Sequence, residues 1–138
     1  MKVQAYVSFY GRCEEALEFY RTAIGAEVTA LLRWKDHPDE TMTTPPGYAE
    51  KIMNAVFRIG NTELMADDGM GETRAEFKGM TLAIEVSDDA EAQRVFAALA
   101  EGGTVIMPLM KTFWTSSFGM LTDKFSVPWM VNVAIPHA

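Results

Sequence analysis

Few side chains in this 138-residue chain suit nucleophilic or metal-dependent chemistry. There are two histidines, His37 and His137, and neither lies in a stretch that alternates like a strand, so we expect both at the surface. The single cysteine, Cys13, begins a segment with helical periodicity, a position that can lower a thiol pKa. Glu14 and Glu15 follow it and oppose a thiolate. We therefore expect Cys13 to cap or fill the start of a helix.

Glu85 is the candidate general base. Burial in an apolar site would raise its pKa toward neutrality, as a general base requires. The alternative is a solvated carboxylate at the end of a strand. Ser116 and Ser117 follow Trp114 in a Thr/Ser-rich turn, without the Gly-x-Ser-x-Gly sequence of a nucleophile elbow. We expect the two serines to be loop residues that could hydrogen-bond a ligand.

Methionine and aromatic residues are more numerous than reactive ones. The chain has ten Met, eight Phe, four Tyr and three Trp. Methionine fills irregular gaps and suits adaptable binding surfaces, and aromatic rings can stack on a planar ligand. For each residue taken singly, core packing is the alternative to ligand binding.

Hydrophobic periodicity predicts alternating strands and helices. The expected strands are 3–9, 27–34, 52–59, 62–66, 80–86, 104–109, 118–122 and 129–134. One helix should begin near Cys13 and end at Gly25, and a second should follow Ser87 or Asp88 as N-cap and end at Gly102. Segment 35–51 contains three prolines and should be a long loop, either a lid over a site or a disordered excursion.

The order β-α-β-β-β therefore occurs twice. A shift of 77 residues superposes Glu14 on Glu91, Phe19 on Phe96, Gly25 on Gly102, and Val28 on Val105. Such duplication predicts an α+β fold of two βαβββ modules, about residues 1–68 and 79–138, within a single domain of residues 1–138. Each module should form a curved mixed sheet with its helix outside, and small molecules commonly bind in apolar concave sites between such sheets.

This order resembles the vicinal oxygen chelate superfamily, which includes glyoxalase I, extradiol dioxygenases and bleomycin-resistance proteins. Three stretches are similar to its PhnB-like group, also labelled as a 3-demethylubiquinone methyltransferase-like domain. They read YVSFYGRCEEALEFYRTAIGAEV, IGNTELMADD and VIMPLMKTFWTSSFGMLTDKFSVPWMVN. The sequence shows no Gly-rich strand-to-helix turn of the kind that holds an adenosyl cofactor, and we expect no cofactor.

The resemblance also implies where metal ligands would lie. Metal-using members of the superfamily place four ligands, usually His and Glu, in the cup between the sheets. Here the four positions fall on Ala5, Met65, Thr81 and Met130, or on Asn132 if the last turn is shifted by two residues. Ala has no donor atom, and a Met thioether suits soft Cu(I) better than the metals of these enzymes. We therefore expect no metal.

A second set of possible ligands consists of carboxylates alone. Glu63, Asp67 and Glu85 have the strand parity of Met65 and Thr81, and carboxylates could hold Mg²⁺ or Mn²⁺. However, Asp67 should begin a turn, and the two glutamates could lie at strand ends in water. We treat this set as an alternative to an apolar pocket.

The predicted function is metal-independent binding of a small apolar or aromatic molecule in the cup. The alternative is a metal-dependent isomerase, lyase or dioxygenase of the same superfamily. The apolar positions where metal-using relatives carry charge favour the first hypothesis. The candidate pocket residues are Ala5, Val7, Met65, Thr81, Ala83, Phe113, Trp114, Met120, Trp129 and Met130.

Composition limits the classes of binding partner and the cellular compartment that we expect for this protein. The net charge is −7 and no Lys/Arg cluster is present, which argues against nucleic acid. No apolar run approaches the roughly 18 residues of a membrane span. A lone cysteine fits a reducing compartment, and residues 1–12 do not resemble a signal peptide, so we expect a cytoplasmic protein. From the resemblance we also expect a homodimer.

Overall fold

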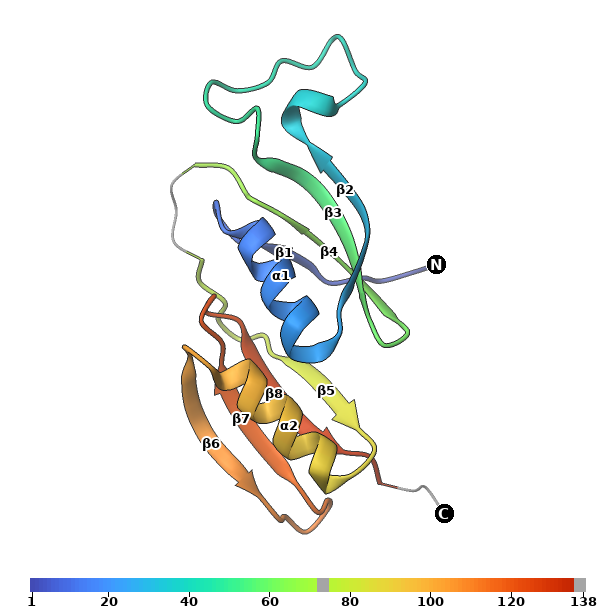
Figure 1. The fold of residues 1–138 in the computed structure, drawn as a ribbon, viewed down its shortest axis with the longest axis vertical. Coiled ribbons are helices and arrows are strands. Elements are labelled where there is room, and N and C mark those ends of the chain that lie inside the picture. Colours follow the sequence, from blue (N-terminus) through green and yellow to red (C-terminus); the bar gives the residue numbers. More distant parts are fainter. Residues whose placement is uncertain (72–74, 136–138) are drawn as a thin grey trace. The chain divides into compact units, whose positions relative to one another are not determined.

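The computed structural model describes residues 1–71 and 75–135. The chain divides into two compact units, Met1–Ala75 and Glu76–Ala138, and each is described by itself. Both units have one helix against a four-stranded sheet (Figure 1).

The first unit contains strand β1 (Tyr6–Ser8), helix α1 (Cys13–Ile24), β2 (Glu27–Arg33), a short 3-10 turn η1 (Trp34–Asp36), β3 (Ile52–Ile59) and β4 (Thr62–Asp67). The strand order is β1-β4-β3-β2, with β1 parallel to β4 and the other pairs antiparallel.

The second unit repeats this topology with β5 (Leu82–Val86), α2 (Asp89–Ala100), β6 (Thr104–Met110), β7 (Phe118–Thr122) and β8 (Pro128–Val133). The strand order is β5-β8-β7-β6, again with the first strand parallel to the last. The predicted α+β fold with two βαβββ modules and mixed sheets is confirmed. The strands expected at 3–9 and 80–86 are shorter, because ladder pairing begins only at Tyr6 and Leu82.

Local chemistry explains where α2 begins and where both helices end. The Asp88 carboxylate accepts a hydrogen bond from Glu91 N at 2.8 Å, and Glu91 in turn accepts from Ser87 N at 3.0 Å. The first of these bonds makes Asp88, and not Ser87, the N-cap, and the second ties the preceding residue to the first turn. Gly25 and Gly102 follow the two helices at φ of 71° and 74°, a left-handed conformation that glycine adopts without strain.

The start of α1 is held by a tertiary contact. Arg12 is the N-cap and makes no side-chain capping bond. The Asp68 carboxylate instead accepts from Cys13 N at 2.9 Å and from Ile52 N at 2.6 Å, so it ties the helix to the start of β3. Cys13 is completely buried, as expected for a residue that fills the helix start.

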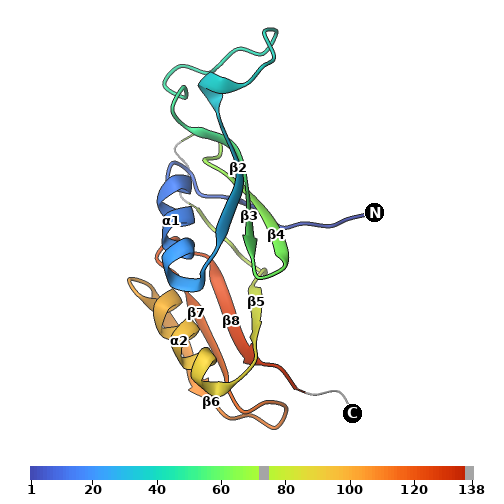
Figure 2. The same ribbon diagram turned by 45° about the vertical axis from the view of Figure 1, so that its right-hand side comes forward.

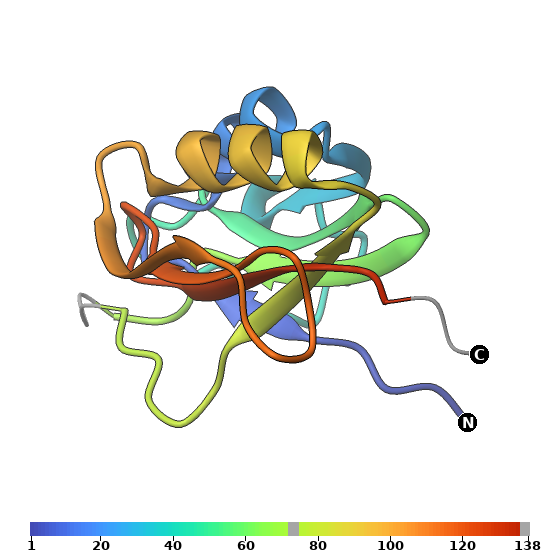
Figure 3. The same cartoon turned by 90° about the horizontal axis from the view of Figure 1, so that it is seen from below.

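Each helix covers one face of its own sheet (Figures 2 and 3). In the first unit, Leu17 and Tyr20 of α1 are buried together with Phe57 and Leu64 of the sheet. In the second unit α2 lies directly on β7: a Cβ at Gly119 would lie 2.7 Å from Phe96 Cε2. Because side chains alternate along a strand, every second residue of each sheet points to the other, helix-free face.

Segment 35–51 is an organised loop at the end of the first sheet (Figure 1). Lys35 N donates to Ala49 O at 3.0 Å, and the Trp34 ring packs edge-on against Tyr48 and His37. These contacts argue against a disordered excursion, and a role as a lid stays a prediction. His37 is also half-buried beside Trp34, contrary to the surface position expected for it, whereas His137 lies outside the described residues.

Within residues 1–71 and 75–135, no helix is long and apolar enough to cross a membrane.

Candidate functional site

The helix-free face of the second sheet carries a continuous row of apolar side chains. The strand register aligns Ala83, Met130, Met120 and Met107 across all four strands. Neighbouring residues in sequence, such as Val131, are buried under α2, so the row lies on the opposite face. Met120 and Met130 are half-buried, and Met107 is 37% exposed. The structure thus brings together three residues of the predicted pocket: Ala83, Met120 and Met130.

An aromatic residue lies beside the row that neighbours the methionines. The next row along the strands contains Glu85, Asn132, Phe118 and Met110. Trp114 Nε1 donates to Asn132 Oδ1 at 3.2 Å, and the Trp114 ring meets Phe118 edge-to-face at 5.2 Å. Trp114 therefore lies against the row next to the methionine row, and its role in a pocket stays a prediction.

Hydrogen bonds fix the loop that carries Trp114. Thr115 Oγ1 donates to Val133 O at 2.8 Å, and the Ser116 and Ser117 hydroxyls both donate to Asp89 Oδ1, at 2.5 and 2.7 Å. These two bonds lower the pKa of Asp89, because they stabilise its ionised form. The serines, which sequence reasoning offered as possible ligand contacts, are thus engaged with the first turn of α2.

Phe113 and Glu85 are both open to solvent. Phe113 is 97% exposed and contacts the Trp114 ring at 4.8 Å. Glu85 is exposed beside Asn132 on the helix-free face. The burial that would adapt Glu85 to a general-base role is therefore not present in the second unit, and the solvated alternative fits better.

Trp129 and Val7 lie on the faces that the helices cover. Trp129 is 3% exposed, and its Nε1 donates to Asp123 Oδ2 at 2.9 Å. Val7 is 7% exposed and pairs with the fully buried Ala66. They do not share a face with the other pocket residues, because the pleat points them to the opposite side of the sheet from Met130 and Met65.

The register of the first sheet does not bring Ala5 and Met65 to the same face, as the implied metal positions would require. Met65 pairs with Tyr6, so Ala5 is offset by one residue and points to the other face. The row on the helix-free face is Tyr6, Met65, Val56 and Ala30. Beside it, Asp67 Oδ2 accepts from the Tyr6 hydroxyl at 2.8 Å.

Asp67 Oδ1 is occupied as well, by the Ser8 hydroxyl at 2.7 Å and by Gly69 N at 2.9 Å. Sequence reasoning considered Asp67 only as a possible metal ligand and did not consider Tyr6 or Ser8. The alternation of Tyr6 and Ser8 in the first strand was a visible signal, but their partner lies 59 residues or more away in sequence.

The residues at the positions implied for a metal do not fit a hard divalent cation. Met65 and Met130 offer only thioethers on the helix-free faces of their sheets, and Ala5 offers no donor. Thr81, exposed just before β5, is a weak neutral ligand. In the described part of the chain, no group of three or more His, Cys, Asp and Glu is arranged to hold a metal ion.

In the described part of the chain, the alternative ligand set of Glu63, Asp67 and Glu85 does not form a metal-binding group. Glu63 is exposed and receives bonds from Lys2 at 3.1 Å and from Gln4 at 2.8 Å. The hydrogen bonds from Lys2 and Gln4 lower the pKa of Glu63, because they stabilise its ionised form. Asp67 already accepts hydrogen bonds from the Tyr6 and Ser8 hydroxyls, and Glu85 is exposed on β5 of the second unit.

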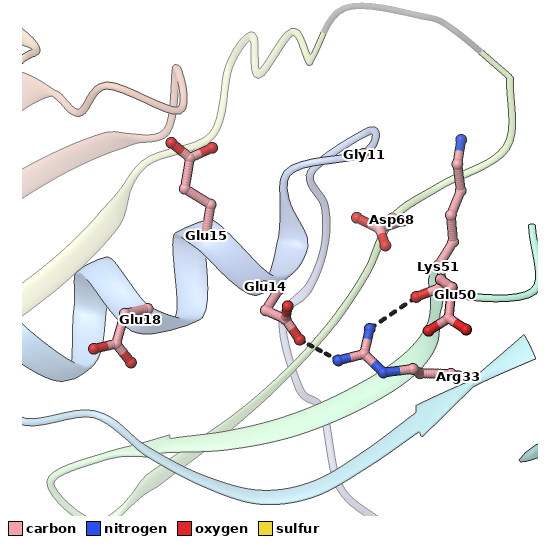
Figure 4. Close-up of a pocket in the computed structure, with 8 residues that line it drawn as sticks. All are labelled: Gly11, Glu14, Glu15, Glu18, Arg33, Glu50, Lys51 and Asp68. Atoms are coloured by element: carbon pink, nitrogen blue, oxygen red, sulfur yellow. Dashed lines mark hydrogen bonds and ion pairs between the residues drawn. The ribbon is translucent and has the colours of Figure 1, made fainter.

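A separate depression of about 650 Å³ opens beside the first turns of α1 (Figure 4). It is lined by polar residues that include Glu14, Glu15, Arg33, Glu50 and Asp68. Its central cation is already paired: Arg33 donates to the Glu14 carboxylate and to the backbone oxygen of Glu50. The depression contains none of the pocket residues predicted from the sequence, and its charged groups serve to hold α1 against the loop.

Comparison with known proteins places the chain in a family. A model of the family described as 3-demethylubiquinone-9 3-methyltransferase matches residues 1–132. Protein YjdN of Escherichia coli strain K12 is 34% identical over 140 residues, which cover 96% of this chain and 95% of YjdN. The crystal structure of protein PA1353 from Pseudomonas aeruginosa is 41% identical with a TM-score of 0.85, covering 96% of this chain and 97% of PA1353.

Two further solved structures are similar to this chain. A putative 3-demethylubiquinone-9 3-methyltransferase, PhnB protein, from Bacillus cereus is 27% identical with a TM-score of 0.80, covering 97% of this chain and all of that one. Fosfomycin resistance protein FosX from Mesorhizobium loti is only 12% identical, with a TM-score of 0.63 over 98% of this chain and 92% of FosX, and shows the shared fold alone. The chain therefore belongs to the PhnB-like family that carries the 3-demethylubiquinone-9 3-methyltransferase description, and its fold is that of the vicinal oxygen chelate superfamily.

Proposed function

We propose that this protein binds a small apolar or aromatic molecule on the helix-free face of its second sheet, and that binding needs no metal. The observation that carries the proposal is the row of Ala83, Met130, Met120 and Met107 across four strands. Trp114, hydrogen-bonded to Asn132 in the neighbouring row, would add an aromatic wall.

The physical basis is the burial of apolar surface. A flat aromatic molecule that removes about 100 Å² of methionine surface from water would gain about 2.5 kcal/mol from that contact. Methionine also makes favourable sulfur–aromatic contacts and adapts its shape to different guests. These properties support an apolar guest and leave the identity of that guest to experiment.

The donor set supports metal independence. Met65, Thr81 and Met130 are poor partners for the hard cations that catalyse isomerase, lyase or dioxygenase reactions. The alternative, a metal-dependent enzyme with Glu85 as base, would need ligands of a different kind at these positions. Metal analysis of the purified protein distinguishes the two hypotheses.

The test uses the neutral dye N-phenyl-1-naphthylamine, whose fluorescence rises in apolar sites. Met120→Gln and Met130→Gln together replace two thioethers by amides of similar length. We expect the double variant to bind the dye at least tenfold more weakly, because amides must be desolvated. Met70→Gln is the matched control, since Met70 is 59% exposed in the first unit, and it should bind as the wild type does.

Two results would overturn the proposal. One is equal dye affinity in the wild type and the double variant, with both folded by circular dichroism. The other is loss of binding after treatment with a chelator, together with stoichiometric metal in the untreated protein, which would support the enzyme alternative.

We retain the homodimer as part of the proposal. Val105 and Ile106 on β6, the last strand in the order of the second sheet, are 47% and 61% exposed in the single chain. Exposed apolar side chains on a terminal strand suit a contact with a second copy.

A further inference from the structure

The helix-free face of the first sheet contains a polar cluster that the proposed function does not use. Asp67 ends β4, and its carboxylate accepts three hydrogen bonds, from Tyr6 Oη at 2.8 Å, Ser8 Oγ at 2.7 Å and Gly69 N at 2.9 Å. Two donors from strand β1 and one from the turn after β4 fix the orientation of this carboxylate. A fixed anion is a preorganised acceptor, because it need not lose side-chain freedom when a ligand binds.

The cluster still has acceptor capacity. An ionised carboxylate offers about four lone-pair positions, and among the described residues Tyr6 alone donates to Asp67 Oδ2. The Tyr6 hydroxyl uses its one proton in that bond, so its oxygen is left as an acceptor. Desolvation and the hydrogen bond to Asp67 raise the pKa of Tyr6, so the phenol keeps its proton at neutral pH. Two acceptor atoms therefore lie 2.8 Å apart on a residue pair that is partly open to solvent.

The other acidic residues on this face are paired with cations. Glu63 forms a salt bridge with Lys2 at 3.1 Å, and Glu27 forms one with Arg58 at 2.7 Å. Among the described residues, no Lys or Arg forms a salt bridge with Asp67; its three donors are neutral groups. The charge of Asp67 is thus oriented and not neutralised in that part of the chain.

Apolar surface adjoins the acceptors. Tyr6, 47% exposed, is followed across the sheet by Met65 and Val56. A ligand with a cationic donor group and a small apolar body would match both features. The donor group would approach Oδ2 and the phenol oxygen, while the body would rest on the Tyr6 ring and Met65.

We propose that Tyr6, Asp67 and Ser8 form a second binding site, which takes an amidinium or ammonium group attached to a small apolar body. A charge-assisted bond to an ionised acceptor is roughly twice as strong as a neutral one, which gives the site its preference for a cation. The site goes beyond the methionine face of the second unit and does not depend on binding there.

The test compares benzamidine with benzamide, its neutral counterpart of the same shape. Each compound is titrated into the ¹⁵N-labelled full-length protein. Benzamidine should shift the amide signals of residues 6–8 and 65–69, with an affinity at least tenfold higher than that of benzamide. Equal affinity for the two compounds, or no shift of these signals with benzamidine, would overturn the proposal.

Asp67→Asn removes the charge and preserves the contacts. The amide oxygen can still accept from Ser8 and Gly69, and the Tyr6 hydroxyl can rotate to accept from the amide nitrogen. We expect benzamidine binding to weaken at least tenfold, about 1.4 kcal/mol. Glu63→Gln is the matched control: it removes a carboxylate from the same face, and it should change the affinity less than twofold.

Equal losses in Asp67→Asn and Glu63→Gln would mean attraction by diffuse surface charge, and the proposal would be rejected. Tyr6→Phe gives a second test that keeps the Asp67 charge: it should weaken benzamidine binding at least threefold, and unchanged binding would count against the two-acceptor site. Asp67→Asn should leave naphthylamine dye binding unchanged, so this site and the methionine face can fail separately.

Discussion

The turn between β7 and β8 depends on one buried carboxylate, and its removal should show that Trp129 is structural. Asp123 is 3% exposed. Its Oδ1 accepts from Phe125 N at 2.9 Å and from Val127 N at 3.0 Å, and its Oδ2 accepts from Trp129 Nε1 at 2.9 Å. Asp123→Asn retains an oxygen for the two backbone donors, but it sets an NH₂ group against the indole N–H.

The cost can be worked from these bonds. A hydrogen bond to a charged group contributes about 1.5–3 kcal/mol, and a buried donor without a partner costs about 1–3 kcal/mol. We expect Asp123→Asn to lower the free energy of unfolding by about 2–4 kcal/mol. Trp129→Phe should cost about 1–3 kcal/mol, since it leaves Oδ2 without its indole donor and removes part of a buried ring.

A double-mutant cycle isolates the Asp123–Trp129 contact. In the double variant the new amide NH₂ group no longer faces the indole N–H. The decrease in the free energy of unfolding should therefore be smaller than the sum of the two single decreases by at least 1 kcal/mol. The assay is urea unfolding followed by circular dichroism. Trp114→Phe is the control, because Trp114 is 40% exposed and should change stability by less than about 0.5 kcal/mol. A coupling energy below about 0.5 kcal/mol would refute the reasoning.

Two more predictions concern the thiol and the assembly state. Burial raises the pKa of Cys13, with Asp68, Asp67 and Glu14 adding to the effect. The resulting stabilisation is fully present below the unfolded-state pKa of about 8.5 and is lost as pH rises toward the folded-state pKa. Between pH 8 and 10 the free energy of unfolding should fall more steeply for the wild type than for Cys13→Ala, and parallel urea-unfolding curves across that range would contradict the assignment. The homodimer predicts a mass of about twice 15.3 kDa by light scattering, and a single-chain mass at micromolar concentration would refute it.

Local sequence signals predicted much of the fold. Strand 118–122 has the expected bounds, and Gly25 and Gly102 end the helices as expected. These features depend on residues close together in the chain: alternation along a strand and a left-handed residue after a helix. The N-terminal strand was predicted too long because its length is set by its partner β4, more than fifty residues away.

The candidate site was less accessible to sequence reasoning. Ala83, Met120 and Met130 were predicted, and the register brings them into one row. Alternation alone shows that neighbours such as Trp129 and Met130 point to opposite faces, but it does not show which face a helix covers. The Trp129 indole turned out to be bound to Asp123 under α2.

The sequence by itself determined the duplicated βαβββ order, the family and the small number of metal-binding side chains, because these depend on residue type and spacing along the chain. Only the tertiary structure decided which residues meet. Pairing of β1 with β4 joins Tyr6 and Ser8 to Asp67, and the order of the second sheet aligns three methionines. Strand register is a long-range property, and a shift of one residue would turn every one of these side chains to the other face.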